Sequence, residues 1–214
     1  MKNFVASSLA SILALVGASA HAGEGYVGIG STGFDLGYGF KLQPNMGLRA
    51  EANFLNIRRD FNNNGADYTA KLKFSNLGAF YDYFPAGSFR LTGGVLLGTR
   101  KLEGTGVTTG GTVIVNGTAY PAPAGESVTV TDTFPNATPY LGIGFGHGQG
   151  TGGFGFYFDA GVALGKSDVT LVATPGIVAA AGQANIDAEQ AKVQDKLNQL
   201  KAYPVIKLGI SYAF

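Results

Sequence analysis

The sequence contains no cysteine and no tryptophan, and only 14% of its 214 residues are charged. The absence of cysteine excludes disulfide bridges and thiol chemistry. Beyond the N-terminal segment there is no run of about eighteen or more apolar residues, so no transmembrane helix is predicted there. With 2 histidines and no cysteine, a His/Cys metal centre is excluded, and we predict no cofactor. The near balance of 15 basic and 14 acidic residues gives no indication of a nucleic-acid partner.

Glycine is abundant, with 34 residues, and 10 tyrosines and 15 phenylalanines are spread along the chain. Many glycines and dispersed aromatic residues are typical of an antiparallel protein with many strands and tight turns. The sequence therefore predicts an all-β domain.

Residues 1–22 have the composition of a secretory signal peptide. A basic start, Met1-Lys2-Asn3, precedes an apolar stretch at 4–16, and the segment ends in the small-residue pattern Ala20-His21-Ala22. We expect cleavage after Ala22, with Ala20 as the alternative, which leaves a mature domain of residues 23–214. An N-terminal membrane anchor is the other interpretation, but the apolar stretch is short and ends in small residues.

Alternation of apolar and polar residues is the strongest pattern in the mature chain. In residues 34–42 every second residue is Phe, Leu or Tyr, and the residues between them are Asp, Gly or Lys. Successive side chains of a strand point to opposite faces, so this pattern is typical of a strand between lipid and a polar lumen. Similar segments predict eight strands, at about residues 25–31, 34–42, 46–60, 67–84, 88–102, 137–147, 154–172 and 203–214.

The predicted connections are short at one end of the strands and longer at the other, as in outer-membrane barrels with short periplasmic turns and long extracellular loops. The longest are about 103–135 and 173–202. Within the first of these, residues 112–115 and 127–131 are predicted to form a β-ribbon. The topology requires an unusually tight outer turn near residues 31–33. If residues 25–42 were one strand, the count would fall to seven and the topology would fail.

One amphipathic helix is predicted in the last extracellular loop, at about 186–201, because apolar residues recur there at helical spacing. We expect it to cap the barrel mouth; a lid over an apolar site or a docking surface is the alternative. Its apolar face consists of Ile186, Val193, Leu197 and Leu200.

Charged residues fall at the positions predicted to face inward. Lys or Arg facing lipid near the midplane costs about 2–4 kcal/mol, so these side chains are expected in the lumen. In so narrow a barrel they are expected to pair with one another, with Glu51 contacting Lys71 or Lys73; an ion path or a polar ligand site is the alternative. The predicted lumen network consists of Asp35, Arg49, Glu51, Lys71, Lys73, Arg90, Asp159 and Lys207.

His147 is the one histidine of the predicted mature chain, and it tests whether the protein is an enzyme. A lipid-modifying barrel enzyme, such as a lipid A deacylase, needs a histidine beside a nucleophile and a carboxylate. His147 stands among glycines with no serine or carboxylate near it in the sequence. We expect a solvated turn histidine and predict no catalytic residue.

The chain ends in an alternating strand that closes on Ile210, Tyr212 and Phe214. With the alternation and the loop asymmetry, this ending resembles the OmpA/OmpW-like superfamily of small outer-membrane proteins. The resemblance implies an eight-stranded antiparallel transmembrane β-barrel in the cell outer membrane. It also implies that these three residues form the signal read by the barrel-assembly machinery. We expect no separate peptidoglycan-binding domain.

The same resemblance implies contact with outer-membrane lipid and lipopolysaccharide and a non-enzymatic function. Members of this class bind or pass small hydrophobic molecules, adhere to host surfaces or are structural. The leading hypothesis is a structural or interaction role, or binding or passage of a small hydrophobic molecule. The alternatives are a lipid-modifying enzyme and an adhesin that acts through its long loops.

Overall fold

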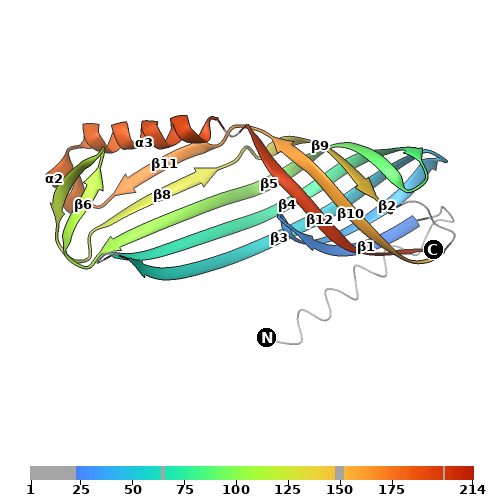
Figure 1. Cartoon of the computed structure of the whole chain (residues 1–214), viewed down its shortest axis with the longest axis horizontal. Coiled ribbons are helices and arrows are strands. Elements are labelled where there is room, and N and C mark those ends of the chain that lie inside the picture. The colour runs from blue at the N-terminus through green and yellow to red at the C-terminus, as the bar shows by residue number, and fades with distance from the viewer. Residues whose placement is uncertain (1–22, 64–65, 148–151, 200) are drawn as a thin grey trace.

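The computed structural model describes residues 23–63, 66–147, 152–199 and 201–214. The predicted signal peptide, with Ala20 and Ala22, lies outside these residues. The molecule is elongated, with a β-barrel at one end and a curved sheet carrying helices at the other (Figure 1). The barrel strands are β1 (Gly23–Gly30), β2 (Gly33–Gln43), β3 (Met46–Asn63), β4 (Ala66–Ala86), β5 (Phe89–Thr108), β9 (Ala137–Phe145), β10 (Gly153–Leu164) and β12 (Ala202–Ala213).

The eight strands form a closed antiparallel ring. Their order is β5-β4-β3-β2-β1-β12-β10-β9, and the pairing of β9 with β5 closes it. β1 and β2 are joined by a tight turn at residues 31–32, with Gly30 opposite Gly33. The predicted count of eight strands and the tight first turn are therefore confirmed. At the opposite end, which we call the turn end, Gly23 and Phe214 exchange backbone hydrogen bonds.

The barrel strands are apolar outside and polar or small inside. Phe154 and Phe156 of β10 point outward and are each 84% exposed, whereas Tyr157 and Asp159 point inward and are buried. The final strand follows the same rule, with Ile210, Tyr212 and Phe214 exposed on the outside. This continuous apolar exterior is the pattern that a lipid environment requires.

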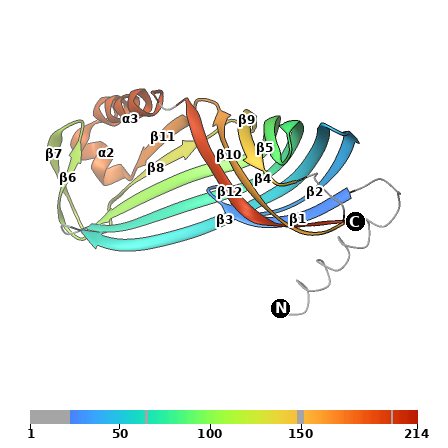
Figure 2. The ribbon, with the colours of Figure 1, turned by 45° about the vertical axis from the view of Figure 1, so that its right-hand side comes forward.

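Three of the strands continue beyond the barrel. β5 pairs there with β8 (Ser127–Thr133), and β8 pairs with β11 (Asp168–Ala173). A hairpin of β6 (Gly111–Val115) and β7 (Thr118–Ala122) stands at the far end. We call this part the extension; its inner face continues the barrel interior and its outer face continues the barrel exterior. Figure 2 shows β3, β4 and β5 running without a break from the barrel into the extension.

Beyond the barrel, the inner face of β3, β4 and β5 changes from polar to largely apolar, and their outer face changes from apolar to charged. On the inner face Ile57, Leu72 and Leu102 lie opposite one another in register, in line with the polar lumen side chains. On the outer face Arg58, Lys71 and Glu103 lie opposite one another, in line with lipid-facing side chains. A strand that passes from lipid into water keeps its period of two but needs its polar side chains outside. The place where the two faces change therefore marks the edge of the apolar band on the barrel exterior.

Two helices cover part of the inner face of the extension. They are α2 (Pro175–Ala181) and α3 (Gln183–Leu197). α3 confirms a helix in the predicted place, about 186–201, with shifted bounds, whereas α2 was not predicted. Gly182 separates them with a φ of 79°, a backbone conformation that favours glycine and interrupts the helix. No helix among the described residues is long and apolar enough to cross a membrane.

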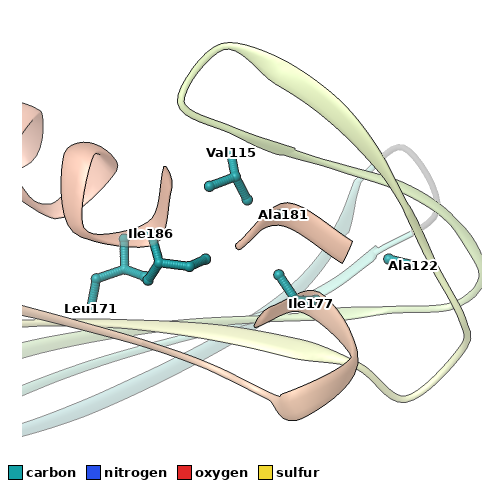
Figure 3. Packing of buried hydrophobic residues seen from close by; sticks show 6 residues of the cluster. All are labelled: Val115, Ala122, Leu171, Ile177, Ala181 and Ile186. Carbon is teal, nitrogen blue, oxygen red and sulfur yellow. The ribbon is translucent and has the colours of Figure 1, made fainter. Parts of the chain in front are cut away.

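An apolar core lies between these helices and the strands of the extension. Ile177 of α2 and Ile186 of α3 are fully enclosed and pack with Leu171 of β11 (Figure 3). Val115 and Ala122 of the hairpin and Ala181 complete the cluster. The extension therefore has a hydrophobic core of its own, separate from the barrel interior.

Two predicted elements pair differently in the structure. Residues 112–115 belong to β6 and pair with β7, whereas 127–131 belong to β8 and pair with β5 and β11. The predicted ribbon between them is wrong, because the turn at Asn116 and Gly117, both with positive φ, folds β6 back onto β7. The predicted strand at 154–172 is divided into β10 and β11.

Candidate functional site

Two arginines and two aspartates join opposite walls of the barrel interior. Arg49 of β3 donates from Nη2 to Asp82 of β4 at 3.1 Å and from Nη1 to Asp159 of β10 at 3.3 Å. Arg90 of β5 donates from Nη2 to Asp159. All four side chains are buried. Two positive and two negative charges compensate each other, and hydrogen bonds satisfy much of their polar surface, as a buried ion network requires.

A second polar group lies around Lys207 of β12. Its Nζ donates to Glu51 and, at 2.8 Å, to Oδ1 of Asn53. Thr32 in the tight turn donates to the same Asn53 oxygen at 2.9 Å. Tyr157 donates to Asp35. This group ties the last strand of the barrel to β3 and to the first turn.

The lumen prediction is wrong for two of its eight residues. Asp35, Arg49, Glu51, Arg90, Asp159 and Lys207 are buried in the barrel interior. Lys71 and Lys73 are instead exposed on the outer face of the extension, and Lys71 pairs with Glu103 at 2.9 Å. The expected contact of Glu51 with Lys71 or Lys73 does not form, because Glu51 accepts a hydrogen bond from Lys207.

Aromatic and aliphatic side chains fill the end of the lumen toward the extension. Tyr203 of β12 lies edge-on to Phe74 with ring centroids 5.4 Å apart, and Phe134 lies 5.9 Å from Tyr203. Below them Phe80, Leu96, Tyr140, Ala163 and Val205 form a buried cluster. A hollow of about 30 Å³, the room of one or two waters, opens beside His147 at the turn end. Such filling is what a barrel of eight strands is expected to have.

His147 is buried at the turn end, with 3% of its surface exposed. Its Nδ1 lies against Glu24 of β1, and its ring lies 4.4 Å from that of Tyr26 and 4.2 Å from that of Tyr157. The prediction of a solvated histidine without a carboxylate beside it is therefore wrong. Glu24 is 123 residues away in the sequence, so only the closure of β1 onto β12 and β10 brings the two together. Its enclosure keeps the ring away from a lipid substrate.

The inner face of the extension exposes apolar side chains that α2 and α3 do not cover, and the exposed Arg59 lies between two of them on β3. Phe61 of β3 stacks on Tyr68 of β4, with ring centroids 5.3 Å apart and an angle of 13° between the planes. Phe61 is 54% exposed and Leu102 is 46% exposed. Ile57 is also exposed, and Leu72 between it and Leu102 is half-buried. We call Ile57, Phe61, Tyr68, Leu72 and Leu102 the apolar row.

The four residues predicted for the apolar face of the loop helix differ in their burial. Ile186 lies in the extension core, and Val193 and Leu197 are half-buried on α3. Leu200 lies outside the described residues. Two glutamines that sequence reasoning missed have a clearer role: Gln190 and Gln194 accept hydrogen bonds from the backbone of Leu171 and Val169. Their spacing of four residues on the helix matches the spacing of two on the strand.

No three histidine, aspartate or glutamate side chains gather into a metal-binding group within the part of the chain that the structure describes. Two surfaces of the extension are candidates for a functional role. One is the charged outer face of the extension, and the other is the apolar row.

No family model and no curated protein matches the sequence. CarO of Acinetobacter baumannii superposes with a TM-score of 0.64 at 19% identity, over 91% of this chain and 98% of that chain. CarO2 of the same organism gives 0.64 at 18% identity, over 91% and 99%. A major outer membrane protein from Thermus thermophilus gives 0.43 at 14% identity, over 92% and 100%. The likeness to CarO and CarO2 shows the eight-stranded transmembrane barrel fold of outer-membrane proteins.

Proposed function

We propose that this chain is a non-enzymatic barrel of the bacterial outer membrane that binds a small apolar molecule outside the cell. The barrel holds the extension on the extracellular side, and the apolar row forms the binding surface. Four of its five members are exposed although α2 and α3 shield the neighbouring strands of the same sheet. This exposed row, next to a well-packed core, is the observation that carries the proposal.

The placement in the outer membrane is supported by the apolar exterior and by the fold shared with CarO. We expect Ile210, Tyr212 and Phe214 to serve the barrel-assembly machinery as its recognition signal. Cell fractionation should recover the protein with the outer membrane, and it should migrate faster on a gel before boiling than after. Recovery in the soluble periplasm would contradict the placement.

Binding outside the barrel is favoured over passage through it. The buried ion network and the edge-to-face rings of Phe74, Tyr203 and Phe134 occupy the interior, so a solute would have to displace paired charges. Breaking a buried pair costs about 3–5 kcal/mol. We therefore expect no conductance steps when the protein is inserted into a planar bilayer.

An apolar fluorescent dye tests the binding surface directly. The chain has no tryptophan, so dye emission can be read without tryptophan background. With the protein in lipid nanodiscs, Phe61→Ala combined with Tyr68→Ala should weaken dye binding about tenfold, because two large rings leave the surface. Val172→Ala removes an exposed apolar side chain elsewhere in the extension and serves as the control. Equal loss in both variants would refute the apolar row as the site.

The two alternative functions differ in support. A lipid-modifying enzyme is disfavoured because His147 is enclosed at the turn end. An adhesin is favoured by one feature, the β6–β7 hairpin at the far end of the extension, where Ile114 is 72% exposed. Adhesion of cells to a host surface should then fall with Ile114→Ser and remain with Phe61→Ala.

A further inference from the structure

Like charges oppose each other on the outer face of the extension, directly beyond the apolar band of the barrel. Arg58 lies opposite Lys71, and Lys73 lies opposite Lys101. Like charges in directly opposed positions of neighbouring strands destabilise a sheet. The four cations, which we call the cationic patch, therefore oppose the pairing of the strands that carry them.

Two carboxylates, Asp60 and Glu103, contact three of these four cations. Glu103 accepts from Lys71 at 2.9 Å and from Lys101 at 3.3 Å, and these lysines hold the pKa of its carboxyl below the usual value. Asp60 accepts from Arg58 at 3.0 Å. Lys73 makes no hydrogen bond or ion pair among the described residues, and it is exposed. Asp67 and Asp168 also lie on the outer face, but within the described residues the four cations form ion pairs only with Asp60 and Glu103.

The position of the patch relative to the barrel exterior suggests what compensates it. Along β4 the outward positions run from Lys71 through Lys73 and Ser75 to Leu77, which is 61% exposed on the barrel exterior. Lys73 is therefore four residues, or about 13 Å of strand, from a lipid-facing side chain. This is the depth at which the headgroups of a surrounding leaflet would lie. Asp60, Glu103, Asp67 and Asp168 do not lie closer to the barrel than Lys73.

We propose that the cationic patch binds the phosphate groups of a lipid headgroup in the outer leaflet, namely the phosphorylated headgroup of lipopolysaccharide. The ammonium groups of Lys73 and Lys101 contact phosphate as compact charges, and the Arg58 guanidinium donates to it in a fork. Anionic oxygen between the opposed cations removes their repulsion, so the bound headgroup also stabilises β3, β4 and β5 beyond the membrane. The inference rests on the outer-membrane placement proposed above.

The test compares lipid A carrying both phosphates with lipid A of the same acyl chains from which they have been removed. The full chain in detergent micelles is mixed with each lipid, and bound lipid is counted by native mass spectrometry. The double variant Lys73→Gln with Lys101→Gln should bind the phosphorylated lipid about twenty-fivefold more weakly, at roughly fivefold for each lysine near a charged surface. Lys192→Gln with Lys196→Gln, on the exposed side of α3, removes the same charge and should bind as the unaltered chain does.

A variant that is expected to bind the lipid more tightly distinguishes loss of the site from unfolding of the protein. Glu103→Gln frees Lys71 and Lys101 and removes a negative charge, so it should bind phosphorylated lipid A about fivefold more tightly. Weaker binding by Glu103→Gln, equal loss in the α3 control, or equal binding of the dephosphorylated lipid would each overturn the proposal. Competition by millimolar inorganic phosphate as effective as that by lipid A would also overturn it, since the site would then be for a free ion.

The two proposals fail in different ways. Cell fractionation and the gel shift of the unaltered chain report whether the barrel is in the outer membrane at all. Outer-membrane recovery without phosphate-dependent lipid binding would refute the cationic patch alone.

Discussion

The side chain of Gln194 accepts a hydrogen bond from the backbone N–H of Val169, with 2.7 Å between Oε1 and N. Gln190 does the same for Leu171 at 2.9 Å. The helix α3 thus takes the place of a neighbouring strand along the outer edge of β11, and its glutamines supply acceptors that a strand would have provided. An edge that is covered in this way cannot pair with another chain.

Replacing both glutamines by alanine should open this edge. Each hydrogen bond contributes about 1 kcal/mol, so the amides of Val169 and Leu171 should exchange with deuterium roughly fivefold to tenfold faster. Gln183→Ala, which removes a side chain that bonds only within α3, is the control. Unchanged exchange at both amides would show that α3 does not protect the edge.

The buried charges of the barrel should respond strongly to the loss of one carboxylate. Asp159→Asn removes the negative charge that Arg49 and Arg90 share. We expect a loss of about 3–5 kcal/mol in barrel stability, because a buried cation is left uncompensated. The temperature at which the folded gel band disappears should fall. Asp60→Asn, at an exposed ion pair, should leave that temperature nearly unchanged; a similar fall would contradict the account.

The core of the extension should unfold independently of the barrel. Ile177→Ala and Ile186→Ala each remove a fully enclosed side chain, which costs about 2–5 kcal/mol in cores of other proteins. Limited proteolysis should then cut the segment of α2 and α3, while the folded gel band persists at its usual temperature. Loss of that band in parallel would mean that barrel and extension unfold as one unit.

The tight first turn should depend on a single glycine. Gly33 has a φ of 97°, and a Cβ added there would clash with the backbone of Phe54. Gly33→Ala should therefore reduce the amount of folded barrel severalfold, because both the backbone conformation and the space are unsuitable. Gly25→Ala meets open space and is the matched control. The folded and unfolded bands of unboiled samples give the readout, and equal yields would refute the argument.

The barrel strands were predictable because lipid imposes one rule on every exterior position. Tyr157 and Asp159 could be assigned to the inside from their neighbours Phe154 and Phe156 alone. The same rule misplaced Lys71 and Lys73. The alternation of two residues shows which side chains share a face of the strand, but it does not show which face is in contact with water. Where β4 leaves the barrel, its outer face passes from lipid to water. Phe74 is buried on the inner face of β4, and from it toward the extension the inner positions of the strand are apolar.

The contacts of His147 and the pairing of β8 were beyond sequence reasoning for a different reason. Each depends on a partner far away in the chain, and local residues do not specify it. His147 meets Glu24 across 123 residues, and β8 pairs with β5 and β11 rather than with the nearer β6. The glycines around His147 carry no information on the burial of its ring.

The unbroken strands also set the height and stiffness of the extension. β4 is 21 residues long, and about ten residues suffice to cross the hydrocarbon layer of a membrane. At about 3.3 Å per residue and a tilt of about 40°, the remainder rises roughly 25 Å above the lipid. Its ladder with β3 runs without a register shift from Met46 to Asn63, so no hinge lies between the membrane and the far end. A pull on that far end is therefore transmitted through continuous hydrogen-bonded strands to the barrel wall.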